Sequence, residues 1–217
     1  MNPSPTSLAP FITFEGIDGA GKSTHVEAVR ALLASRGIEV ICTREPGGTP
    51  LGESVRELFL HHDMSPHTEA LLVFAARREH IERVVWPALA RGVWVLCDRF
   101  TDATFAYQGG GRELGAAHVE ALAHIVHPNF KPDLTLLFDL APDHALMRIA
   151  KRGAADRIEA EASDFHFRVR QAYLERAAAA PERIRVFDTR APKDVVAEQV
   201  LATVASFINR RRDSQCG

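Results

Sequence analysis

The chain contains little cysteine. Its three cysteines, Cys42, Cys97 and Cys216, are odd in number and widely spaced, which excludes a disulfide framework and the common metal-binding cysteine motifs. No apolar run approaches the length of a membrane span, and the first ten residues lack the basic start and apolar core of a signal peptide. We therefore expect a cytoplasmic protein without a membrane partner.

The chain also lacks an excess of charge of either sign. Its 26 Lys and Arg residues nearly balance 28 Asp and Glu residues, so no overall positive field favours nucleic acid as a partner. The ten histidines show no metal-ligand spacing. With 217 residues, 46% of them apolar, we expect one domain over residues 1–217 with a sizeable core.

A glycine-rich stretch near the N-terminus, GIDGAGKST over residues 16–24, has the G-x-x-x-x-G-K-[ST] spacing of a phosphate-binding loop. A strand-like run precedes it and a helix-like run follows it, as the motif requires. The loop residues predicted to hold ATP are Gly16, Ile17, Asp18, Gly19, Ala20, Gly21, Lys22, Ser23 and Thr24. Lys22 is predicted to span the β- and γ-phosphates and Ser23 to ligate Mg²⁺. The alternative is a glycine-rich turn with an ordinary exposed lysine.

Five short apolar runs alternate with helical patterns along the chain. They are PFITFEG, IEVICT, VWVLCD, LTLLFDL and IRVFDT. Helices are expected near residues 22–35, 52–60 and 68–90, from about 163, and up to about 209. Strands that are apolar on both faces belong in a parallel sheet covered by helices. We therefore predict a doubly wound α/β fold of the P-loop NTPase class, with five parallel strands and helices on both faces.

The absence of an N-K-x-D segment argues against a small GTPase, and the short length favours a kinase for a small acceptor. Such an enzyme needs a second anion site, and Asp98 and Arg99 stand at the end of the strand VWVLCD, at the expected ligand edge. The alternative for this pair is a surface salt bridge. Phe74 and Arg77 share one helix face and could stack on and hydrogen-bond a flat base, unless Phe74 is simply a core residue.

A kinase also needs a cover against water. Four cations, Arg148, Lys151, Arg152 and Arg157, surround a Gly-Ala-Ala break, which suits a lid over ATP phosphates at about residues 148–160. The alternative is a solvated basic helix face.

These stretches together resemble the thymidylate kinase family. The matching segments run in order from Phe11 to Glu161, and TREPGGT, DRF and AYQGGGR are the most specific. The resemblance implies transfer of the ATP γ-phosphate to dTMP, giving dTDP for DNA synthesis, with Mg²⁺ as cofactor and a homodimer as the assembly.

The resemblance also implies roles for individual residues. Asp18 would approach the acceptor ribose and the transferring phosphate, Arg99 would bind the dTMP phosphate, and Asp98 would face magnesium. The remaining acceptor-binding residues would be Glu45 and Pro46 in the pocket wall, Arg77 on thymine, Thr104 and Gln108 on base or sugar, and Tyr107 beside the deoxyribose.

Two assignments stay open at this stage. In one branch of the family a catalytic arginine lies inside the phosphate loop, but the corresponding positions here are Gly19 and Ala20. The resemblance therefore implies a catalytic arginine in the lid. Arg152 is preferred for this role, and Arg148 is assigned to ATP binding. In many relatives the base-stacking Phe lies four residues before the thymine-binding Arg, a position that Val73 occupies relative to Arg77. Either Phe74 stacks from a shifted position, or the pair is Phe74 and Arg78.

Two other functions compete with this one. The chain could be a P-loop kinase for a different nucleoside or nucleotide, or a nucleotide-binding switch without turnover.

Overall fold

The computed structural model describes residues 9–150 and 156–216. Its centre is a parallel sheet of five strands in the order β2-β3-β1-β4-β5. The strands are β1 (Phe11–Glu15), β2 (Val40–Arg44), β3 (Trp94–Asp98), β4 (Leu134–Asp139) and β5 (Ile184–Asp188). Each lies within or next to a run predicted from the sequence, so the strand predictions are confirmed.

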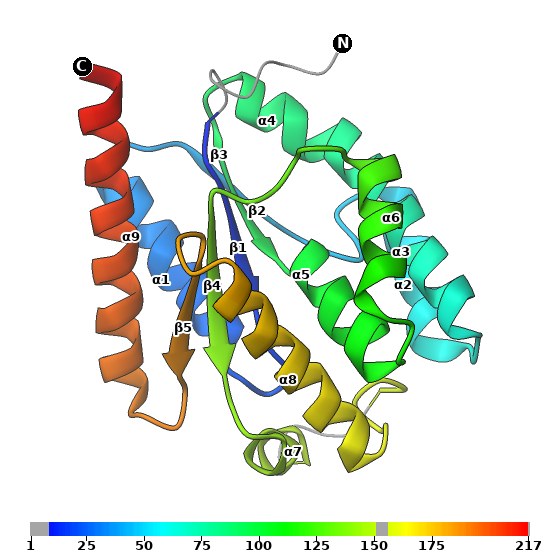
Figure 1. Ribbon diagram of the computed structural model, residues 1–217. Coiled ribbons are helices and arrows are strands. Elements are labelled where there is room, and N and C mark those ends of the chain that lie inside the picture. The colour runs from blue at the N-terminus through cyan, green and yellow to red at the C-terminus, as the bar shows by residue number, and fades with distance from the viewer. Residues whose placement is uncertain (1–8, 151–155, 217) are drawn as a thin grey trace.

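Helices pack on both faces of this sheet (Figure 1). In Figure 1, α1 and α9 lie together on one side, while α8, α5 and α6 lie on the other. The helices are α1 (Lys22–Ser35), α2 (Pro50–His61), α3 (Pro66–His80), α4 (Trp86–Ala90), α5 (Thr101–Thr104), α6 (Ala116–Val126), α7 (Pro142–Ala150), α8 (Ser163–Ala179) and α9 (Lys193–Cys216).

Local sequence explains where several helices begin. The Thr49 side chain accepts a hydrogen bond from the Gly52 N–H at 2.9 Å, and Pro50 occupies the first helical position of α2. In the same way, the Ser65 side chain accepts a hydrogen bond from the Thr68 N–H at 3.2 Å, and Pro66 occupies the first helical position of α3. A side-chain oxygen satisfies a free helical N–H, and proline is already restricted to a helical φ, so both fix a helix start.

Two segments have π-helical geometry, which the sequence patterns did not predict. The helix expected over residues 68–90 is α3 and α4 joined by the π segment η2 (Ile81–Val85). A second segment, η3 (Phe105–Gly111), follows α5 and carries Tyr107 and Gln108. A π segment rotates the side chains that follow it relative to an α-helix, so η3 sets where these two side chains point.

The strand register brings polar residues to one edge of the sheet. Asp98 at the end of β3 pairs in register with Phe14 and Arg44, and Asp139 pairs with Asp188. The strands themselves are mostly buried and apolar. Because parallel strands end at the same edge, their carboxyl ends form a polar floor for ligands. Among the described residues, no helix is long and apolar enough to cross a membrane.

Candidate active site

The phosphate-binding loop joins β1 to α1. Gly21 has a left-handed backbone with φ of 89° and offers no side-chain cap to α1. The first N–H groups of α1 therefore stay available for an anion at the positive end of the helix. Gly16 is required for a different reason, since a Cβ there would lie 2.4 Å from the Phe138 carbonyl oxygen.

Lys22 lies folded over this loop. Its Nζ donates to the carbonyl oxygens of Gly16 at 3.0 Å and Ile17 at 3.3 Å, and its side chain is buried. Burial and the neighbouring Arg99 guanidinium lower the pKa of Lys22. A phosphate group would supply the negative charge that this buried ammonium lacks.

Arg99 connects the loop to the acceptor side. Its Nη2 donates to Asp18 Oδ1 at 2.7 Å and its Nη1 to the Gly16 carbonyl at 3.0 Å, while its guanidinium lies 4.7 Å from the Tyr107 ring centre. Tyr107 also donates to Asp18 Oδ2 at 3.0 Å. Burial opposes the charge of Asp18, but the Arg99 guanidinium outweighs it and holds the pKa of this carboxyl well below its usual range.

The fully buried carboxyl group of Glu15 is linked to Arg99 through neighbouring hydrogen bonds. Glu15 accepts from the Phe100 N–H at 2.7 Å and from the Tyr173 hydroxyl at 2.8 Å, and Arg99 Nη1 donates to the same hydroxyl at 3.2 Å. Burial and the nearby Asp102 carboxylate raise the pKa of Glu15 to about 8. Neither Glu15 nor Tyr173 is predicted from the sequence to take part in the site.

Next to this group lies a cavity, which we call the acceptor cavity. Of the predicted acceptor residues, Asp18, Glu45, Pro46, Arg77, Arg99, Thr104, Tyr107 and Gln108 line it. Arg56, Phe59 and Phe100 also line it and were not predicted from the sequence. Val73, which occupies the usual base-stacking position relative to Arg77, lines it as well. The cavity therefore has apolar walls and a few converging polar groups, the usual composition of a small-molecule site.

Arg77 is held at the inner end of the acceptor cavity by buried partners. Its Nε donates to Glu45 Oε2 at 2.7 Å and its Nη2 to Thr104 Oγ1 at 2.9 Å. His80 Nδ1 lies 2.9 Å from the other Glu45 oxygen. Arg77 Nη1 is buried without a hydrogen-bond partner in the described part of the chain. This leaves one donor of a permanently charged group for a ligand.

The structure separates the two arginines left open by the sequence. Arg78 does not line the acceptor cavity; it donates to the Val126 carbonyl at 2.7 Å and to Glu82 at 2.8 Å. Of these two arginines, Arg77 is therefore the one that lines the acceptor cavity.

The structure corrects the expectation that Phe74 stacks on a base in the acceptor cavity. Phe74 does not line the acceptor cavity but packs with Phe105 and Val119, and its ring centre lies 4.8 Å from the Arg77 guanidinium carbon. Its ring thus supports Arg77 from the side away from the cavity. The reason is helical spacing, because Val73, one position earlier, turns towards the cavity instead.

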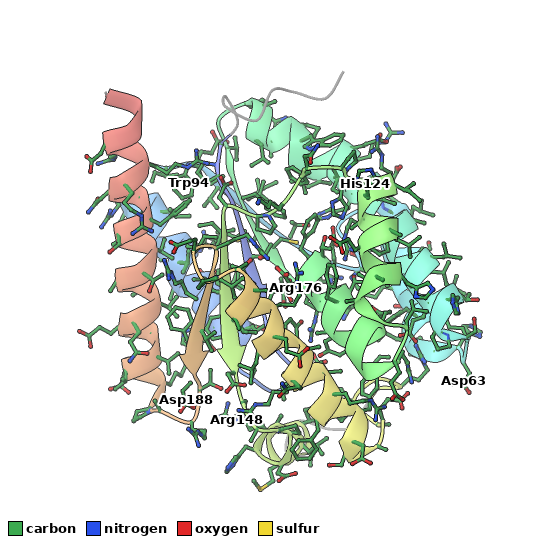
Figure 2. All side chains as sticks on the ribbon, viewed as in Figure 1. Asp63, Trp94, His124, Arg148, Arg176 and Asp188 are labelled. Carbon is green, nitrogen blue, oxygen red and sulfur yellow. The ribbon has the colours of Figure 1, made fainter. Side chains whose placement is uncertain are left out.

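A second cavity, the donor cavity, lies on the other side of the phosphate loop. Its lining includes Gly21, Thr24, Arg148, Thr189 and Lys193. Arg148 is fixed there, because its two terminal nitrogens donate to the Gly19 carbonyl at 3.3 Å and the Thr189 carbonyl at 2.9 Å. Figure 2 shows Arg148 and Asp188 near the carboxyl ends of the strands.

The predicted lid is described only in part. Arg152 and Lys151 lie outside the described residues, so no geometry applies to the preferred catalytic arginine. Arg157 differs from the expectation that it faces ATP: its Nη2 donates to Glu69 Oε2 at 2.8 Å and its Nε to the Phe59 carbonyl at 2.9 Å. Its neighbours Asp156 and Ile158 line the acceptor cavity, so this end of the lid forms part of the wall of that cavity.

The predicted magnesium position is compatible with the side chains present. Asp98 Oδ1 is buried without a hydrogen-bond partner in the described chain, and Ser23 is exposed at the start of α1. Among the described residues, no cluster of three or more acidic, His or Cys side chains forms a metal cage. Mg²⁺ commonly binds through one or two protein oxygens plus substrate phosphates, which fits such a sparse site.

Several residues of the site lie in motifs that the sequence analysis quoted without assigning them. Glu15 stands in PFITFEG and Phe100 in DRF, while His80 lies three positions after Arg77. Because they lie close in sequence to the phosphate loop, Arg77 or Arg99, these residues could have been predicted as candidate site residues. Phe59 and Tyr173 had no such signal, because only tertiary packing brings α2 and α8 to the site.

Comparison with known proteins agrees with this geometry. The thymidylate kinase family model matches residues 14–200. A thymidylate kinase of Methylobacillus flagellatus is 54% identical over 197 residues, covering 91% of this chain and 97% of the relative, and one of Bordetella pertussis is 53% identical, covering 94% and 98%. The crystal structure of thymidylate kinase from Ehrlichia chaffeensis superposes with a TM-score of 0.74 at 34% identity, covering 91% of this chain and 98% of that one. The chain belongs to the thymidylate kinase family.

Proposed function

We propose that this chain transfers the γ-phosphate of ATP to dTMP, giving ADP and dTDP. The observation that carries the proposal is Arg99, whose guanidinium bonds the phosphate loop at Gly16 and lines the acceptor cavity. A bidentate guanidinium at that boundary suits a phosphate that must face the ATP γ-phosphate. Family membership supports the same reaction.

The acceptor cavity suits a nucleotide with a flat base. Its walls include Phe59, Val73 and Phe100, and the free Nη1 of Arg77 offers a hydrogen bond to a base oxygen. We assign base contact to these walls rather than to Phe74. Thr104 acts through Arg77, because its hydroxyl accepts from the guanidinium.

On the donor side, the loop residues 16–24 would hold the ATP phosphates and Arg148 would contact the adenosine end. Arg148 lines the donor cavity with Thr189 and is bonded to two carbonyl groups, which leaves its flat face for a base. Ser23 and Asp98 would hold Mg²⁺. When bound, the ion neutralises charge on the β- and γ-phosphates.

The reaction then needs positioning more than a strong base. An oxygen of the dTMP phosphate, already ionised at neutral pH, attacks the γ-phosphorus in line as the bond to ADP breaks. Lys22 and Arg99 hold the reacting groups, and Asp18 holds Arg99 through its ion pair. We assign the remaining charge on the transferring group to Arg152 of the lid.

We further propose one domain over residues 1–217, a cytoplasmic location, and a homodimer. The dimer proposal rests on α3 and α6, which pack on each other while leaving Leu71 and Ile125 57% and 74% exposed. Large exposed apolar side chains on neighbouring helices suit a protein interface.

An acceptor panel tests the function. Coupled release of ADP is measured with dTMP, dUMP, dCMP, dGMP and deoxythymidine, and we expect dTMP to be preferred at least about ten-fold. The Lys22→Ala variant, purified in the same way, controls for contaminating kinases and should lose most activity. A stronger preference for another acceptor would assign a different kinase, and no acceptor-dependent turnover would indicate a nucleotide-binding switch.

A further inference from the structure

The fully buried carboxylate of Glu69 in α3 lies between the acceptor cavity and the lid. It accepts hydrogen bonds from Gln108 Nε2 at 2.7 Å, Arg157 Nη2 at 2.8 Å and Arg112 Nε at 3.3 Å. These donors come from three different segments: η3, the lid and the turn that follows η3. The proposed reaction assigns Glu69 no role.

We propose that Glu69 is a positioning residue that orients the Gln108 amide towards the base of the acceptor and fastens the lid over the same cavity. Base selection and the position of residues 156–161 beside the cavity would then depend on one carboxylate. This inference rests on the proposed function, since it concerns how the acceptor of that reaction is selected.

The amide orientation follows from hydrogen-bond chemistry. A carboxylate that accepts from two guanidinium groups has only acceptor oxygens, so the Gln108 side chain must turn its NH₂ towards Glu69. Its carbonyl oxygen is left for a ligand, and Gln108 lines the acceptor cavity. Glu69 therefore fixes Gln108 as an acceptor in that cavity.

Arg77 contributes the opposite polarity. Its buried Nη1 is a donor without a partner in the described chain, and Arg77 lines the same cavity as Gln108. Thymine presents an acceptor at O4 and a donor at N3–H, whereas cytosine presents a donor at N4 and an acceptor at N3. A donor from Arg77 beside an acceptor from Gln108 suits thymine and opposes cytosine.

Arg157 carries the connection to the lid. Its Nε donates to the Phe59 carbonyl at 2.9 Å, and its guanidinium carbon lies 5.4 Å from the centre of the Phe59 ring, which lines the acceptor cavity. The flanking residues Asp156 and Ile158 line that cavity as well. The bond between Arg157 and Glu69 therefore holds the end of the lid against the acceptor.

Arg112 adds a second connection to the same end of the lid. Its Nη1 lies 2.6 Å from Glu161, while its Nε contacts Glu69. The two arginines place positive charge on both sides of Glu69. A neutral side chain of the same shape at this position would leave two partly buried guanidinium groups without their counter-charge.

The Glu69→Gln substitution tests the proposal, because it keeps the shape and removes the charge and one acceptor. We measure kcat and KM for dTMP and dCMP. The ratio of kcat/KM for dTMP to that for dCMP should fall by about ten-fold or more, since the Gln108 amide is free to reverse. The kcat with dTMP should fall as well, because the lid loses its anchor. Glu79→Gln on the same helix, where Glu79 pairs with exposed Arg83, is the matched control and should change neither quantity.

Double variants separate the two roles. Glu69→Gln should be non-additive with Gln108→Ala in the dTMP to dCMP ratio, and non-additive with Arg157→Ala in kcat. Additive effects, or an equal loss for both acceptors with an unchanged ratio, would overturn the proposal and indicate a structural role only.

If Glu69→Gln does not fold, Glu69→Asp keeps the charge but withdraws it from Gln108, and the ratio should still fall. An unchanged ratio in a folded Glu69→Asp enzyme would also overturn the proposal. A wild-type enzyme without dTMP turnover would instead contradict the proposed function.

Discussion

At the scale of single residues, the site depends on buried polar groups that support one another. Arg99 has a φ of 71°, a left-handed conformation that is unfavourable for a side chain other than glycine. The Arg99 N–H donates to the Phe14 carbonyl at 3.0 Å, and the following N–H, of Phe100, donates to Glu15. The bonds on either side hold the strained backbone, and the strain turns the Arg99 side chain back towards the phosphate loop.

A buried histidine beside the acceptor cavity gives a prediction for stability. The ring of His127 contacts Phe74 and Phe100, and burial together with Arg77 lowers its pKa to about 4. Between pH 6.5 and 4 the unfolded chain therefore binds a proton that the folded chain does not, so stability falls as the pH falls. We expect this residue to remove up to about 3 kcal/mol from the free energy of unfolding over that range.

Urea unfolding at pH 7 and pH 4.5 checks this prediction. His127→Gln, which does not titrate, should lose less stability than wild type between the two pH values. His144→Gln, at an exposed position on α7, should behave like wild type. Equal pH dependence in wild type and His127→Gln would contradict the prediction.

At the scale of elements, the segment around the lid borders both the donor cavity and the acceptor cavity. Arg148 on α7 lines the donor cavity, whereas Arg157, at the other end, is bonded to α2 and α3. The two anchored ends therefore border different cavities. Arg152 lies between them in the sequence, outside the described residues, and we propose that its charge acts on the phosphate in transfer.

This arrangement predicts different kinetics for two alanine variants. Arg152→Ala should lower kcat by at least about a hundred-fold with little change in dTMP affinity, because it removes charge needed mainly in the transition state. Arg148→Ala should chiefly raise the KM for ATP. Steady-state kinetics with each substrate varied separates the two effects. An unchanged kcat in both variants would exclude a lid-borne catalytic arginine.

At the scale of the whole molecule, one outer surface carries a line of exposed apolar residues. On α6, Ala117, Ala121 and Ile125 follow one another at helical spacing and are exposed, and α6 packs against α3 (Figure 1). We expect this surface to be the homodimer interface. Light scattering should give about twice the mass of one 23.9 kDa chain for wild type and a single-chain mass for Ile125→Glu.

A second exposed apolar residue provides the control. Val195 on α9 is 40% exposed on another part of the molecule, and Val195→Glu should leave the mass unchanged. A monomeric wild type, or a dimer that survives Ile125→Glu, would place the interface elsewhere or remove it.

The sequence by itself determined the sheet, the phosphate loop and the family. Buried apolar runs and the spacing of the phosphate loop are encoded locally, so β1 and the start of α1 at Lys22 could be predicted from neighbouring residues. Arg99 likewise pointed to an anion site, because it follows a strand that ends at the carboxyl edge of the sheet. The positions of Glu45 and Arg77 in the acceptor pocket rested on the family resemblance.

Tertiary structure alone decided which side chains meet in that cavity. The position of Phe74 behind Arg77, and of Val73 in the wall, depends on how α3 is rotated against η3 and α6. The bonds from Glu69 to Gln108 and Arg157 join residues 39 and 88 positions apart. Such contacts leave no local pattern, since they arise only when separate helices close around one buried charge.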